Sequence, residues 1–119
     1  MALILLVEDN MDMQSLMLDL LEWGGHEVVC GRSGDEALER LESLPRLPDA
    51  IISDLTMPHM DGITLLRTVR ANDRWSSVRF VMMSANLSDP RLTGEASALL
   101  DGLLPKPFDL EDLNRLLEK

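Results

Sequence analysis

Short apolar runs alternate along this chain with longer amphipathic stretches. The first run, residues 3–7, is continuously apolar, as expected for a strand whose two faces are both covered. Similar short runs occur at 28–30, 50–53, 78–83 and 103–104. Because these runs are too short for buried helices, the pattern predicts five strands.

Helical spacing fills the segments between these runs. After the first run, apolar residues recur at i, i+3, i+4 and i+7, and two glycines follow directly. Ser33 and Glu36 have the spacing of a capping box ahead of a second helix. Asp89 followed by Pro90 is typical of an N-cap and first turn, and predicts one continuous helix up to Leu100. The same spacing predicts helices over 63–69 and 110–117.

Five strands that alternate with five helices predict an α/β fold, with a parallel sheet, right-handed crossovers and helices on both faces. The 119 residues agree with a single domain over 1–119. No apolar run approaches the ~20 residues needed to cross a bilayer. The apolar N-terminus lacks the positive segment of a signal peptide and is interpreted as a strand.

The charge of the chain excludes some classes of partner. Acidic residues number 21 against 11 lysines and arginines, which gives a net charge of −10. Such a surface repels phosphate backbones and anionic lipids, so neither nucleic acid nor a membrane is expected as a direct partner. Cys30 is the only cysteine, which excludes an internal disulfide and agrees with a cytoplasmic protein.

Polar residues stand where the predicted strands end. Glu8 and Asp9 follow the first strand, Asp54 the third, Ser84 the fourth and Lys106 the fifth. Because parallel strands end at the same edge of a sheet, we expect these side chains to converge there. That edge is where open α/β sheets bind their ligands.

The residue types in this group point to phosphoryl transfer. Two carboxylates ~4 Å apart repel by on the order of 4 kcal/mol at an effective dielectric near 20, so a cation is expected among the three acids. Oxygen ligands of this kind suit Mg²⁺, with Mn²⁺ as the other choice. A lysine and a hydroxyl beside the metal can bind an anion, which leaves Asp54 as the nucleophile.

These segments together resemble a receiver domain of the two-component response regulators, and the similarity covers essentially the whole chain. The family implies a flavodoxin-like, doubly wound fold with sheet order 2-1-3-4-5. The matching segments, in the order of the family, are Val7-Glu8-Asp9-Asn10, Gly34-Asp35-Glu36-Ala37-Leu38, Asp54-Leu55-Thr56-Met57-Pro58-His59-Met60-Asp61-Gly62, Met83-Ser84-Ala85 and Lys106-Pro107-Phe108.

The resemblance implies a role for each acid. Asp54 would accept a phosphoryl group from the phosphohistidine of a sensor histidine kinase or a histidine phosphotransfer protein. The carboxylates of Asp9 and Asp54 and the backbone carbonyl of Thr56 would bind Mg²⁺, and Glu8 would reach the metal through water. The expected protein is a signalling domain that assists its own phosphorylation and dephosphorylation, and is not an enzyme acting on other substrates.

The resemblance also assigns the groups that bind the phosphoryl oxygens. These are the hydroxyl of Ser84, the ammonium of Lys106 and the backbone N–H of Ala85. The peptide bond between Lys106 and Pro107 would be cis, which costs little before proline. The two added negative charges of a phosphoryl group would then shift the loop after the fourth strand.

One departure from the family concerns the output surface, formed by the fourth helix, the fifth strand and the fifth helix. The family usually has Tyr or Phe three residues before the lysine, whereas this chain has Leu103 and no tyrosine at all. We therefore expect weaker coupling between phosphorylation and this surface. An output domain or a downstream protein is the expected partner there, and a homodimer through the same surface is a further expectation.

Three other functions are compatible with an α/β fold of this kind. A phosphatase of the haloacid dehalogenase type needs an acid two residues after its nucleophile, where this chain has Thr56. A flavin-binding electron carrier needs a Ser/Thr/Gly-rich loop after the first strand and aromatic residues, which are 3% of this chain. A receiver-like protein-binding module that needs no phosphorylation stays open, because Leu103 favours it while the acids and Lys106 oppose it.

Overall fold

Five parallel strands form one sheet at the centre of the computed structural model, which describes residues 2–106 and 108–117. The strand order is β2-β1-β3-β4-β5, and every pairing is parallel. The strands are β1 (Leu3–Val7), β2 (Glu27–Gly31), β3 (Ala50–Asp54), β4 (Arg79–Ser84) and β5 (Gly102–Pro105). The predicted α/β fold and its strand order are confirmed.

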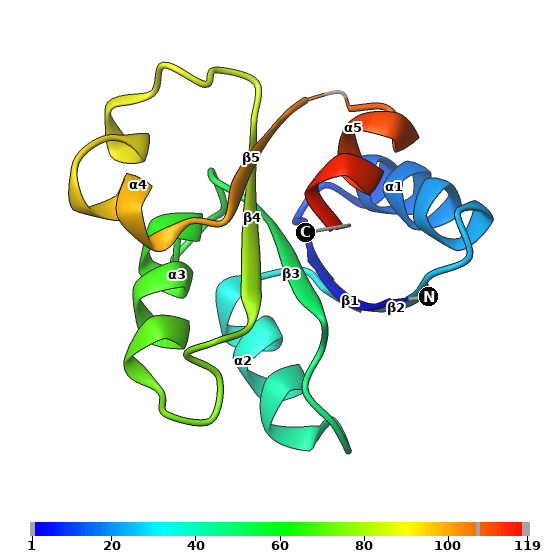
Figure 1. Cartoon of the computed structure of the whole chain (residues 1–119), viewed down its shortest axis with the longest axis horizontal. Helices are drawn as coiled ribbons and strands as arrows, with labels where there is room; N and C mark the ends of the chain where they lie inside the picture. The colour runs from blue at the N-terminus through cyan, green and yellow to red at the C-terminus, as the bar shows by residue number, and fades with distance from the viewer. Residues whose placement is uncertain (1, 107, 118–119) are drawn as a thin grey trace.

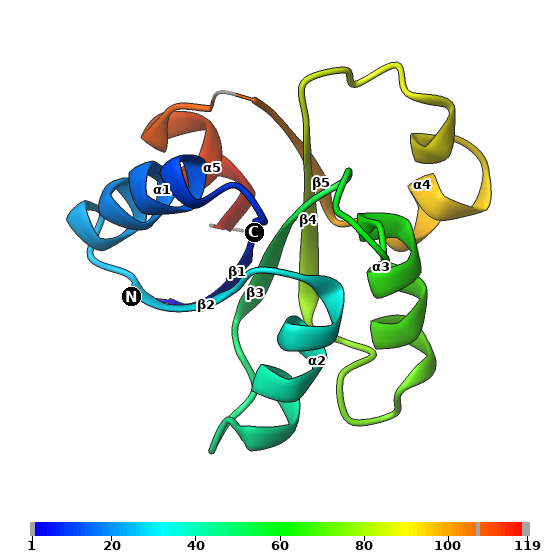
Figure 2. The ribbon, with the colours of Figure 1, turned by 180° about the vertical axis from the view of Figure 1, so that it is seen from behind.

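Helices cover both faces of the sheet. Figures 1 and 2 show α1 and α5 on one face and α2, α3 and α4 on the other. Within residues 2–106 and 108–117, no helix is long and apolar enough to span a membrane. The helices are α1 (Met11–Trp23), α2 (Gly34–Ser43), α3 (Gly62–Ala71), α4 (Glu95–Leu99) and α5 (Leu110–Leu117).

Two apolar layers hold the central strands. Successive strand residues point to opposite faces, so Ile4 and Leu6 of β1 pack with Met17 and Leu21 of α1. Leu5 and Val7, which alternate with them along β1, pack on the other face with α2 and α3. All residues of β1 and β3 are buried, which explains the apolar runs at 3–7 and 50–52 and fixes the position of the carboxyl ends of both strands.

Side-chain caps begin α1, α2 and α3, as the sequence predicts for α2. The hydroxyl of Ser33 accepts the N–H of Glu36, which is the first half of the predicted capping box. At α1 the cap is Asn10, whose side chain accepts the N–H of Met13 at 2.9 Å. Asp9 therefore does not serve as the cap of α1.

The prediction of one continuous helix from Asp89 to Leu100 is wrong. Asp89 does cap a helical turn, but this is a short 3₁₀ turn, Pro90–Leu92. Gly94 follows with a φ of 63°, in the left-handed region that glycine adopts without steric cost. The helix α4 therefore has only the five residues Glu95–Leu99.

Candidate functional site

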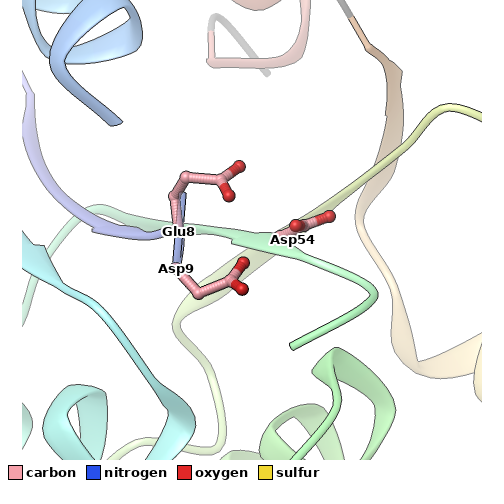
Figure 3. A group of neighbouring side chains, drawn as sticks. All are labelled: Glu8, Asp9 and Asp54. Carbon is pink, nitrogen blue, oxygen red and sulfur yellow. The ribbon is translucent and has the colours of Figure 1, made fainter. Parts of the chain in front are cut away.

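The three acids predicted to converge lie together at the carboxyl edge of the sheet. Glu8 and Asp9 directly follow β1, and Asp54 is the last residue of the neighbouring β3. One carboxylate oxygen from each lies within 4.8 Å of the others. Figure 3 shows the side chains of Glu8 and Asp9 leaving the end of β1 in different directions, with Asp54 beside them.

Lys106 partly neutralises this group. Glu8 is fully buried and Asp54 is 7% exposed, so two unpaired carboxylates here would be strongly destabilising. The Nζ atom of Lys106 lies 2.7 Å from Oε1 of Glu8 and 3.0 Å from Oδ2 of Asp54. The other oxygen of Glu8 accepts the backbone N–H of Asn10 at 3.1 Å.

The protonation of the site follows from burial and these contacts. Burial raises the pKa of Glu8, and the hydrogen bond from Lys106 offsets part of that rise. For Lys106, burial alone would lower the pKa, but the hydrogen bonds to Glu8 and Asp54 outweigh it and the pKa is raised. The lysine is therefore cationic at neutral pH. Because one ammonium faces three acids, the oxygen donors fit a divalent cation.

Gly62 lets the first turn of α3 lie against the backbone of Asp54. Its N–H donates to the carbonyl of Leu55 at 2.8 Å. A Cβ at this position would lie 2.5 Å from the carbonyl oxygen of Asp54. The intervening β3–α3 loop, which includes Thr56, is tightly turned, and His59 in it has a positive φ of 69°. Asp54 is thus held by a short, close-packed connection.

Ser84 and Ala85 stand at the end of β4. The hydroxyl of Ser84 donates to the carbonyl of Asn86 at 2.9 Å and accepts its N–H at 3.0 Å. Ala85, the next residue, is exposed. The N–H of Lys106 donates to the carbonyl of Ser84 at 3.0 Å, which joins β4 to the lysine. In this state the serine hydroxyl is thus engaged with its own loop.

The comparisons with known proteins agree with this geometry. The family model described as the response regulator receiver domain matches residues 4–118. This chain belongs to that family. The receiver domain is 36% identical over 122 residues to the sensor kinase CckA of Brucella abortus (strain 2308), an alignment that covers 99% of the chain but 13% of that protein.

Solved structures resemble the receiver domain over nearly all of its length. The chemotaxis response regulator CheY4 of Vibrio cholerae is 30% identical with a TM-score of 0.85, and the match covers 99% of this chain and 97% of that one. The receiver domain of sensor histidine kinase PA1611 from Pseudomonas aeruginosa PAO1 is 30% identical with a TM-score of 0.87, covering 98% and 94%. That structure has a magnesium ion coordinated in its active-site cleft.

One residue beside the site of this receiver domain was missed by sequence reasoning. Nη2 of Arg91 donates to the hydroxyl of Thr56 at 2.9 Å. Arg91 also forms a two-point contact with Asp89 and lies 3.6 Å from Asp61. No motif includes Arg91, since its spacing from Asp89 indicates only a position in a helical turn.

Two further expectations concern β5 and the residues after it. Leu103 is partly buried and packs against the apolar cluster that β1 and β3 share with α2 and α3. Leucine at 103 therefore takes part in the apolar packing of this receiver domain.

The predicted cis peptide between Lys106 and Pro107 lies outside the described residues, because Pro107 is not among them.

Proposed function

We propose that this receiver domain accepts a phosphoryl group on Asp54 from the phosphohistidine of a sensor histidine kinase or histidine phosphotransfer protein. The observation that supports this most is the placement of Asp54. Its carboxylate lies at the sheet edge, 3.0 Å from the ammonium of Lys106 and beside the carboxylates of Glu8 and Asp9. An acid in that setting is available as a nucleophile and has charges of both signs around it.

A divalent metal is part of this proposal. The carboxylates of Asp9 and Asp54 and the backbone carbonyl of Thr56 would bind Mg²⁺ or Mn²⁺, with Glu8 acting through water. When bound, the ion would neutralise charge on the transferring phosphoryl oxygens. The all-oxygen donor set and the magnesium in the cleft of the PA1611 receiver support this choice.

The side chains of the domain supply the rest of the chemistry. A carboxylate oxygen of Asp54 forms a bond to phosphorus while the phosphorus–nitrogen bond breaks, and the imidazole keeps the electron pair and takes up a proton. Lys106 shifts from Asp54 to a phosphoryl oxygen, and the N–H of Ala85 binds another. The hydroxyl of Ser84 leaves Asn86 to bind the same group. Attack of water on phosphorus later breaks the bond between phosphorus and the Asp54 oxygen, which releases inorganic phosphate and returns the free carboxylate.

Intact mass after incubation with acetyl phosphate tests this function. We expect one added phosphate with Mg²⁺, none without a divalent metal, and none in Asp54→Asn. Asp73→Asn, which changes an exposed acid outside the site, should behave like the wild type. If neither acetyl phosphate nor a phosphorylated histidine phosphotransfer protein adds a phosphate to the wild type, the proposal is wrong.

The second candidate is a protein-binding module that needs no phosphorylation, and Leu103 in place of the usual aromatic residue favours it. In that case Asp54→Asn would bind its partner as tightly as the wild type.

In the phosphorylated mechanism, the partner is an output domain or downstream protein that binds α4, β5 and α5. A homodimer through that surface and a cytoplasmic location belong to the same proposal.

A further inference from the structure

Arg91 joins the two loops that flank the phospho-acceptor. It lies in the β4–α4 loop (residues 85–94), which starts directly after Ser84. Its guanidinium donates to the hydroxyl of Thr56, two residues after Asp54 in the β3–α3 loop. One side chain therefore connects the loop that would bind the phosphoryl oxygens with the loop that includes the acceptor.

The guanidinium is held in place by two acids that are themselves fixed. Asp89 contacts Nε and Nη2 at 3.1 and 2.9 Å, and it also accepts the backbone N–H of Arg91 as the cap of the 3₁₀ turn. Asp61 lies 3.6 Å from Nη1, and its other oxygen caps α3 through the N–H of Thr64. The position of the guanidinium is thus set from both loops, unlike that of a single exposed ion pair.

We propose that Arg91 is a positioning residue that closes the β4–α4 loop over the phosphoryl site through Thr56, and thereby lengthens the life of the aspartyl phosphate. This inference rests on the proposed function. With the loop tied to Ser84 at one end and to Thr56 near the other, water has less access to phosphorus. The negative charge of a phosphoryl group on Asp54 would attract the guanidinium, which contacts Thr56 two residues further along the chain, and would strengthen the same closure.

The fork of the arginine is essential to this role. Arg91 uses separate N–H groups for Asp89, for Thr56 and toward Asp61. A lysine has one ammonium and cannot span these partners in one plane. Arg91→Lys, which keeps the charge, should therefore shorten the lifetime of the aspartyl phosphate nearly as much as Arg91→Ala does.

The lifetime of the phosphoryl group tests the proposal. The protein is phosphorylated with acetyl phosphate and Mg²⁺, freed of the donor and followed by intact mass. Arg91→Ala should shorten the lifetime about three- to tenfold, as expected for the loss of a small network of partly exposed contacts. Thr56→Val, which removes only the hydroxyl's hydrogen bonding, should shorten it in the same direction. The double variant should have nearly the same phosphoryl lifetime as Arg91→Ala alone, because both substitutions remove the same hydrogen bond between Arg91 and Thr56.

Arg67→Ala is the matched control for charge. Arg67 lies on α3 and contacts only the exposed Glu95 among its described ion pairs, at 3.9 Å, so its removal changes the net charge equally. We expect the lifetime in Arg67→Ala to equal that of the wild type. An unchanged or longer lifetime in Arg91→Ala, an equal shortening in Arg67→Ala, or additive effects of Arg91→Ala and Thr56→Val would overturn the proposal.

Amide hydrogen exchange of the unphosphorylated protein separates this inference from the proposed function. Exchange over residues 86–93 should be faster in Arg91→Ala and unchanged in Arg67→Ala. If the wild type accepts no phosphate, the proposed function and the effect on lifetime fail together, and faster exchange would still support the closure. If the wild type is phosphorylated but exchange in Arg91→Ala is unchanged, only the role of Arg91 is wrong.

Discussion

Two halves of this receiver domain differ in how much apolar burial holds them. In the half that positions the acids, β1 and β3 are buried along their whole length between two layers of helices. In the other half, which comprises the β4–α4 loop and α4, the buried residues include Leu92 and Ala96, and arginine side chains add polar connections. Arg70 of α3 donates to the end of α4 and to the segment that precedes β4, and Arg91 connects the β4–α4 loop with Thr56 beside the site.

This difference distinguishes a half that apolar burial holds around β1 and β3, the rigid half, from a half in which polar contacts contribute more, the polar half. Burial of a large apolar side chain contributes about 1.5–3 kcal/mol, and many such residues act together on β1 and β3. A hydrogen bond or partly exposed ion pair contributes about 0.5–1.5 kcal/mol, so contacts of this kind can exchange when a charge appears nearby. Asp54, the proposed acceptor, thus lies on the rigid half, and the loop that we expect to respond to its phosphorylation lies on the other half.

Truncation of the rigid half should have the largest effect. Leu6 in β1 is fully buried, and Leu6→Ala should lower the free energy of unfolding by about 2–5 kcal/mol through lost burial and a cavity. Leu87→Ala is the control, because Leu87 in the β4–α4 loop is 44% exposed and its loss should change stability by less than about 0.5 kcal/mol. Urea denaturation measures both. Equal losses would contradict the contrast between the halves.

Removal of Arg70 should have an intermediate effect. Its side chain is 17% exposed and donates to the carbonyls of Leu99, Ser76 and Val78 and to Asp101. Arg70→Ala leaves these acceptors without the arginine and should lower the free energy of unfolding by about 2 kcal/mol. Amide exchange should become faster near α4 and stay unchanged in β1 and β3.

An exposed arginine provides the control for this change. Arg74 forms a 2.7 Å ion pair with Glu42, and both side chains are mostly exposed. Arg74→Ala should therefore change stability by less than about 1 kcal/mol. If Arg70→Ala is no more destabilising than Arg74→Ala, the hydrogen bonds of Arg70 do not hold α4 in place.

The two halves also differ in how far the sequence predicts them. The strands of the rigid half follow from continuous apolar runs, and the position of the acids follows because parallel strands end at one edge. The contacts of Arg70 with Leu99 and of Arg91 with Thr56 could not be predicted, since these acceptors lie on other segments of the chain and leave no local pattern. The prediction of a continuous fourth helix was wrong because apolar spacing reaches Leu100, but Gly94 has a positive φ between the 3₁₀ turn and the short helix α4.

The smallest effect expected is the response of the polar half to pH. The side-chain hydrogen bond from Arg91 holds the pKa of Asp89 below its ordinary value of 3.8. Because the folded pKa is the lower one, the contact contributes stability that is present above pH 3.8 and is lost as the pH falls through the folded value. The contact between Arg91 and Asp89 should therefore persist at pH 4–5.

An NMR titration of the Asp89 carboxyl carbon measures this directly. In Arg91→Ala the pKa of Asp89 should rise toward 3.8, and in Arg67→Ala it should stay at the wild-type value. A pKa that is the same in all three proteins would mean that the guanidinium spends little time on Asp89. The β4–α4 loop would then be joined to Thr56 more weakly than the geometry indicates, and the contrast between a fixed acceptor and an adjustable loop would become sharper.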